Sequence, residues 1–166
     1  MSFSITLLVL WLMLLLLAQK QFFHIALIGF PGVLMHESMH LIVGLVLLAK
    51  PVSFNLIPHR TANSWQFGSV SFRGLNLFNA APVAYAPLLL LGIAWLLFNH
   101  WMLPMFLAQR YLEWVLSGYL IACALFSSLP STTDVKVGGW STLLWAIAGI
   151  GGWWFWSGYA RFHLIW

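Results

Sequence analysis

Charged residues are scarce in this chain. Only 6% of its 166 residues are charged, three of them acidic, while 62% are apolar. Soluble domains carry about 25% charged residues. A water-soluble fold of this size has too little interior to hide so much apolar surface. The shortage of charge therefore excludes a sizeable soluble domain and predicts one compact helical membrane domain spanning residues 1–166.

Cysteine is almost absent as well. Cys123 is the single cysteine, which excludes an intrachain disulfide framework and the metal motifs built from cysteine pairs. We expect Cys123 to be a small apolar residue of a helix. The seven Lys and Arg residues are scattered singly, which is typical of helix-end anchors and excludes a nucleic-acid partner. They divide almost evenly between the two sides of the predicted membrane domain, so they leave its orientation open.

Long apolar runs are what the chain has instead. A helix of about 20 residues crosses the hydrocarbon core of a bilayer. We expect about five transmembrane helices, one or two of them broken, at residues 3–18, 31–49, 78–98, 109–127 and 139–156. Residues 22–29 are expected to form a half-helix that leads to Pro31, because proline is favoured in the first turn of a helix. Residues 99–104 are expected to form a connection.

One stretch has a different pattern. Residues 52–57 and 66–72 alternate apolar and polar side chains, and the residues between them favour turns. This pattern predicts a β-hairpin. The hairpin must lie at the membrane interface or inside protein, because an open strand edge cannot face lipid. The expected fold class is therefore an all-α polytopic membrane protein with a short membrane-associated β-hairpin.

The three acidic residues need an explanation. A charge at membrane depth costs at least about 2.5–3.5 kcal/mol, so intramembrane acids are usually functional or paired. They are Glu37, Glu113 and Asp134. Glu113 lies near Arg110, and we expect those two side chains to pair.

Glu37 belongs to the sequence His36-Glu37-Ser38-Met39-His40. Two His residues four apart project from one face of a helix, and both imidazoles can reach one metal ion at about 2.0–2.1 Å. Glu37 then sits beside the ion, where it can move a proton from water to a leaving amine. The structural alternative is a pair of hydrogen-bonding His residues with a Glu counter-charge. The motif predicts a zinc-dependent hydrolytic site.

Zinc needs a third protein ligand. The candidates are Asp134, Glu113, His24, His59, His100 and His163. Asp134 is favoured because it follows a stretch broken by proline, and irregular backbone at membrane depth is tolerated where it lines a site buried in protein. The alternative for Asp134 is an N-cap of the last helix.

These motifs resemble the site-2-protease group of intramembrane zinc metalloproteases. Pro31-Gly32 opens the helix with the His pair, and a hairpin follows at 52–72. Asn79-Ala-Ala-Pro82, with a further proline downstream, is similar to the start of the family's middle core helix. Leu129-Pro130-Ser-Thr-Thr-Asp134 is similar to the segment that delivers the aspartate ligand. The likeness covers about residues 30–140, flanked by the helices at 3–18 and 139–156.

The resemblance implies zinc bound by His36, His40 and Asp134, with Glu37 as the catalytic base. It implies cleavage of a transmembrane protein or peptide in a bacterial cytoplasmic membrane, with the substrate chosen by the membrane domain itself or by a partner membrane protein. It also suggests that the hairpin binds an extended substrate by strand addition. The residues expected to contact substrate or stabilise an oxyanion are Asn79, Ser131, Thr132, Phe54 and Phe72.

Two other functions remain open from the sequence. The first is a non-proteolytic scaffold or regulator derived from such a protease, against which the intact Glu37 argues. The second is a haem-binding or transport protein that uses His ligands. His36 and His40 are one turn apart and cannot ligate opposite faces of one haem, so other His residues would have to serve.

Overall fold

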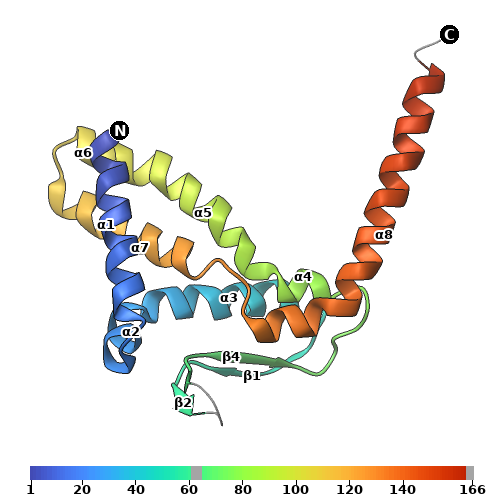
Figure 1. The fold of residues 1–166 in the computed structure, drawn as a ribbon, viewed down its shortest axis with the longest axis horizontal. Helices are drawn as coiled ribbons and strands as arrows, with labels where there is room; N and C mark the ends of the chain where they lie inside the picture. Colours follow the sequence, from blue (N-terminus) through green and yellow to red (C-terminus); the bar gives the residue numbers. More distant parts are fainter. Residues whose placement is uncertain (61–64, 164–166) are drawn as a thin grey trace.

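The computed structural model of the chain describes residues 1–60 and 65–163. It is mostly helical, with an antiparallel hairpin beneath the helices (Figure 1). The elements are α1 (Ser2–Ala18), α2 (Phe22–Ile28), α3 (Phe30–Val46), β1 (Pro51–Asn55), β2 (His59–Arg60), β3 (Trp65–Gln66), β4 (Ser69–Phe72), α4 (Ala80–Ala84), the 3₁₀ turn η1 (Ala86–Leu88), α5 (Leu89–Leu97), the π-helical η2 (Phe98–Met102), α6 (Leu103–Leu107), α7 (Tyr111–Phe126) and α8 (Thr132–His163). The predicted helical fold with one hairpin is confirmed at this level.

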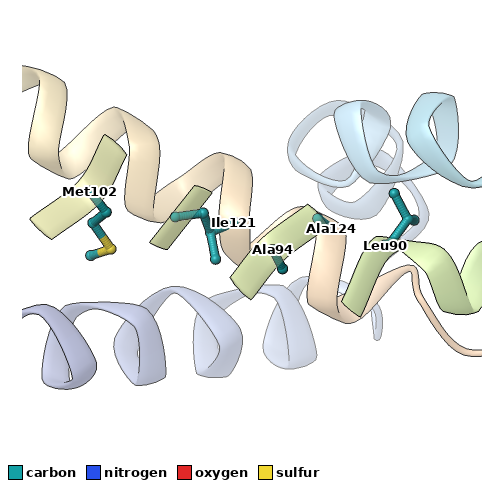
Figure 2. Packing of buried hydrophobic residues seen from close by; sticks show 5 residues of the cluster. All are labelled: Leu90, Ala94, Met102, Ile121 and Ala124. Carbon is teal, nitrogen blue, oxygen red and sulfur yellow. The ribbon is translucent and has the colours of Figure 1, made fainter. Parts of the chain in front are cut away.

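A core of small and medium apolar side chains holds α5 against α7. Its fully buried members are Leu90, Ala94, Met102, Ile121 and Ala124 (Figure 2). The two alanines have small side chains, which lets the helix backbones approach closely. Helix α1 packs along α7, and Cys123 is buried there as the sequence predicted.

The predicted connection at residues 99–104 is wrong. The chain stays helical from Ala86 to Leu107, through Pro104. A proline inside a helix lacks one N–H and clashes with the carbonyl four residues earlier, here that of His100. The helix widens to a π-helix over η2 just before Pro104, and a π-bulge is one of the few ways in which a helix accommodates such a break.

Within the described residues, one helical stretch is long and apolar enough to cross a membrane by length and composition. It is Ala86–Leu107, with 22 residues and a mean hydropathy of 1.6. Three further apolar helices are shorter, namely Ser2–Ala18, Phe30–Val46 and Tyr111–Phe126.

The predicted hairpin is confirmed. Strands β1 and β4 pair antiparallel, with Pro51 opposite Phe72 and Asn55 opposite Ser69, and β2 pairs with β3 further out. Residues 61–64 of the predicted turn lie outside the described residues. Helix α3 ends at Val46 rather than at residue 49, because the backbone turns left-handed at Leu48 and again at Lys50 (φ 55° and 53°).

Helix α8 is longer than predicted at both ends. It begins at Thr132 instead of residue 139, so Asp134 lies in its first turn and not in the irregular stretch before it. The first part of α8 packs on α4, and the rest projects away from the other helices (Figure 1). Gly149, Gly151 and Gly152 in this projecting part pack against no other segment of the described chain, since nothing lies within 4 Å of a Cβ built at any of them.

The turn between α6 and α7 carries backbone strain at Gln109, whose φ is 58°. The N–H groups of Gln109 and Arg110 bond back to the Phe106 and Met105 carbonyls, a common helix ending that favours glycine. A left-handed conformation costs an L-residue about 1–2 kcal/mol. We therefore expect Gln109→Gly to raise the free energy of unfolding by about 1 kcal/mol, seen as a higher midpoint of thermal unfolding. Gln109→Ala keeps the Cβ and should bring no gain.

Candidate metal centre

The His pair lies on a face of α3 that is bounded by glycine at both ends. Gly32, His36, His40 and Gly44 follow one another at four-residue intervals, so they lie on one side of the helix. A Cβ at Gly32 would collide with Ser127 at the end of α7, and one at Gly44 would collide with the Phe72 ring. The two glycines therefore let α7 and the hairpin close over this face on either side of the His pair.

The ring of His36 is oriented by the end of α7. Its Nδ1 lies 2.7 Å from the Ser127 carbonyl oxygen. Ser127 is the C-cap of α7, where carbonyl groups have no partner within the helix. The close approach at Gly32, where a Cβ would lie 3.0 Å from the Cys123 carbonyl oxygen, brings this helix end within reach of His36.

The ring of His40 is oriented by α4. Its Nδ1 lies 2.8 Å from the Val83 carbonyl oxygen, and the bond is buried. In a continuous α-helix that carbonyl would accept the N–H of the residue four positions on. That residue is Pro87, which has no N–H, so the Val83 carbonyl remains available to His40.

The two Nε2 atoms converge with the carboxylate of Asp134. A carbonyl oxygen only accepts, so each neutral ring carries its proton on Nδ1 and has a lone pair on Nε2. The Nε2 atoms lie 3.2 Å apart. Asp134 Oδ1 lies 3.2 Å from Nε2 of His40, and Oδ2 lies 3.4 Å from Nε2 of His36. Ligands about 2.0–2.1 Å from a tetrahedral zinc ion lie about 3.3–3.4 Å from one another, so the spacing fits zinc.

Asp134 is held by the start of α8. Its Oδ2 accepts the Ser131 N–H at 2.7 Å, and the Ser131 hydroxyl accepts the Asp134 N–H at 3.2 Å. This reciprocal pair is a capping box, in which two free N–H groups of a helix start are satisfied. The N-cap residue of α8 is therefore Ser131 and not Asp134, as the alternative from the sequence had it, while the Asp134 carboxylate bonds the N-cap N–H and also faces the His pair.

The donor set fits a divalent cation in charge as well as in spacing. Within the described part of the chain, the side chains of His36, His40 and Asp134 lie close enough together to hold a metal ion. Glu37 lines the same cleft as His40 and Asp134. One doubly charged cation would balance the two carboxylates, and buried charges are normally paired in this way or coordinate metals.

The other candidate ligands lie elsewhere. Glu113 pairs with Arg110 at the start of α7, as the sequence predicted. His24 and His100 are exposed on α2 and η2. The side chains of His59 and His163 are not among those that the structure describes.

Glu37 is buried, with 8% of its surface exposed, and the hairpin covers it. A Cβ at Gly68 would lie 2.7 Å from its Cγ and 2.8 Å from its Oε1. The Gly68 backbone thus lies directly against the carboxyl group. Only a residue without a side chain allows this contact, which fixes where the carboxylate can point.

A cleft of about 580 Å³ opens beside these residues. Its walls come from hairpin residues 67–72, from Val83 and Ala84 of α4, and from Ser131, Thr133 and Val137 at the start of α8. Ser131 and Phe72, both predicted to contact substrate, line it. Thr132 and Phe54 are exposed and are not among its lining residues.

Asn79 is also absent from the cleft lining. Its side chain is buried, where it donates to the Gly74 and Leu47 carbonyls and accepts the Asn76 N–H. These bonds join the end of α3 to the chain before α4. Asn79 therefore shapes the wall that carries Val83 rather than facing a ligand.

Gly68→Ala should test how closely the hairpin controls Glu37. The added methyl group would displace the carboxyl group, and a shift of about 1 Å at a catalytic group can cost about 100-fold in rate. If Glu37 is the base that the sequence predicts, the rate of hydrolysis should fall by about 10–100-fold. Bound zinc should stay unchanged, because the three atoms nearest to a Cβ at Gly68 all belong to Glu37. Gly139→Ala on α8, where a Cβ meets open space, should leave activity unaltered. Equal activity in the two variants would contradict the role of Gly68.

The backbone groups that orient the two His rings could not be predicted from side-chain patterns. The Val83 and Ser127 carbonyls carry no side-chain signal. A proline four residues after Val83 marks a free carbonyl, and glycines four residues to either side of the His pair mark close packing. No protein-family model, curated protein or solved structure matches this chain.

Proposed function

We propose that the chain is an intramembrane zinc metalloprotease that hydrolyses peptide bonds of membrane-embedded substrates. The observation that carries the proposal is the convergence of His36, His40 and Asp134 at 3.2–3.4 Å, with Glu37 in the same cleft. Two His residues and one carboxylate leave a fourth zinc position open, as in catalytic rather than structural zinc sites.

Exposed apolar side chains support a multi-pass membrane location. The outward faces of several helices carry large apolar residues, among them Phe3, Leu10, Leu17, Trp95, Trp153 and Phe155. Soluble monomers rarely expose apolar patches beyond a few hundred Å². In this proposal α1, α3, Ala86–Leu107, α7 and α8 lie in the bilayer. With 32 residues α8 extends for about 48 Å, more than the hydrocarbon core requires.

The chain's own groups account for the proton transfers. The chemistry that zinc supplies when bound is polarisation of the scissile carbonyl and activation of water near neutral pH. Glu37 accepts a proton from the attacking water and donates it to the leaving amine. The carbonyls of Ser127 and Val83 keep both imidazoles turned with Nε2 toward the ion, and such outer partners typically contribute 10–100-fold to metal affinity or activity.

The cleft suits an extended peptide. A helical substrate has its carbonyls bonded within the helix, so it must unwind before hydrolysis. The cleft follows consecutive hairpin residues from Phe67 to Phe72, which supports pairing of an unwound segment with β4. Phe72, Val83 and Val137 give the cleft apolar walls, as a substrate from a membrane span requires.

Metal removal tests the proposal. The whole protein, purified in detergent and reconstituted in vesicles, should contain about one zinc per chain by elemental analysis. Cleavage of a set of single-span transmembrane peptides, followed by mass spectrometry, should stop after chelation and return when zinc is added. The proposal is wrong if the protein neither contains nor binds zinc, or if the chelated protein cleaves as fast as the zinc-loaded one. One iron per chain would instead indicate the oxygen chemistry typical of two His and one carboxylate.

The alternatives make different demands on the site. A haem held by two His residues needs them on opposite faces, whereas the Nε2 atoms of His36 and His40 point at one place. A scaffold without activity has no use for a buried glutamate under a glycine. Both features favour the protease.

A further inference from the structure

The short helix α4 contacts both His40 and the helix that carries Asp134. Through the Val83 carbonyl it orients His40. On its other side it receives the first part of α8, which carries Asp134. The position of Asp134 relative to the His pair therefore depends on how α8 sits on α4.

One face of α8 makes this contact. Asp134, Gly138, Ser141 and Trp145 follow at intervals of four, three and four residues, so they share one side of the helix. Gly138 lies close to α4, since a Cβ there would be 3.1 Å from the Ala84 Cβ. The Trp145 indole donates to the Phe78 carbonyl at 2.9 Å but is half exposed.

Ser141 makes the buried polar bond of this contact. Its Oγ accepts the Ala81 N–H at 2.8 Å, and only 2% of the residue surface is exposed. Ala81 lies in the first turn of α4, where N–H groups have no partner inside the helix. The N-cap residue of α4, Asn79, makes no cap bond with its side chain. A serine from another helix therefore supplies the missing acceptor.

The bond fixes α8 in rotation as well as in position. Ser141 lies seven residues after Asp134, about two turns and about 10 Å along the axis, and only about 20° away around it. A hydrogen bond has a preferred direction, unlike apolar packing. Holding the Ser141 hydroxyl on the Ala81 N–H thus determines where the Asp134 carboxylate points.

We infer that Ser141 is a positioning residue for the metal centre: its bond to Ala81 holds Asp134 against His36 and His40. This inference rests on the metal site of the proposed function, but not on proteolysis. It predicts that removal of one hydroxyl two turns away weakens metal binding with all three ligands intact.

The test measures zinc affinity of the whole protein in detergent, by competition with a chromophoric chelator. Ser141→Ala should bind zinc about tenfold or more weakly, within the range for loss of an outer partner. Ser141→Thr keeps the hydroxyl and should restore most of the affinity. Ser117→Ala is the matched control, because Ser117 is equally buried but its hydroxyl donates within its own helix, to the Trp114 carbonyl. The absorption spectrum of bound Co²⁺ should change in Ser141→Ala and stay unaltered in Ser117→Ala.

A double-mutant cycle separates positioning of Asp134 from general support of the fold. In an Asp134→Ala background, Ser141→Ala should have no further effect on zinc affinity. A loss of equal size in both backgrounds would overturn the inference, as would wild-type affinity in Ser141→Ala. If Ser141→Ala does not fold, Gly138→Val separates α8 from α4 with Ser141 present, and it too must weaken zinc binding. A parent protein that binds no zinc defeats the proposed function itself, whereas a zinc-binding parent with an unaffected variant defeats only the role of Ser141.

Discussion

Glu37→Gln is expected to abolish peptide hydrolysis while zinc stays bound. Glutamine has nearly the same shape and can remain beneath Gly68, but its amide cannot take a proton from water. General acid–base catalysis contributes about 10²–10⁴-fold, so the rate constant for cleavage should fall by at least about 100-fold. The measurement is single-turnover cleavage of a transmembrane peptide by the zinc-loaded variant, with zinc content determined on the same sample.

The chain offers a matched control in its second glutamate. Glu113→Gln makes the same chemical change at the start of α7, where Glu113 pairs with Arg110 on an exposed surface. Exposed ion pairs contribute about 0–1 kcal/mol, so this variant should cleave at the parent rate with little change in stability. If the Glu37→Gln protein cleaves as well as the Glu113→Gln protein, Glu37 is not the base and the mechanism is wrong.

The His pair could be predicted from the sequence because its geometry is local. Four-residue spacing on a helix fixes which side chains share a face, whatever the rest of the chain does. The orientation of the rings is not local. It depends on carbonyl groups of residues 83 and 127, which the fold brings to α3 from distant segments, and backbone carbonyls look alike in every sequence.

The helical breaks show a second limit of local patterns. Pro104 predicts a helix end, but the helix instead widens into the π-helical η2 and continues. Proline at residue 130 does precede a helix start, because the Ser131–Asp134 capping box follows it at once. The difference lies in what surrounds each proline. Hydroxyl and carboxyl groups begin a new helix after Pro130, whereas the residues next to Pro104 are apolar and offer no such cap, so the helix continues.

Asp134 has a structural role and a proposed metal-binding role, and substitutions can separate the two. Oδ2 accepts the Ser131 N–H, and both carboxylate oxygens face the His pair. Asparagine at this position retains an oxygen for the Ser131 N–H but loses the negative charge. Alanine loses both. Ser131→Ala removes the hydroxyl that caps the Asp134 N–H and leaves the carboxylate in place.

Asp134→Asn and Asp134→Ala are therefore both expected to bind zinc more weakly, but only the alanine variant should also weaken the start of α8. Loss of one of three ligands should lower zinc affinity by more than the 10–100-fold typical of an outer partner. In the metal-free state, Asp134→Ala should lose about 0.5–2 kcal/mol of unfolding free energy and Asp134→Asn much less, because a helix cap is worth about that amount. Competition titration gives the affinity, and thermal unfolding after chelation gives the stability. Zinc affinity equal to the parent's in Asp134→Asn would remove Asp134 from the ligand set and leave the capping box as its whole role. Because asparagine keeps the side-chain oxygen that alanine lacks, their comparison assigns each loss to the ion or to the helix end.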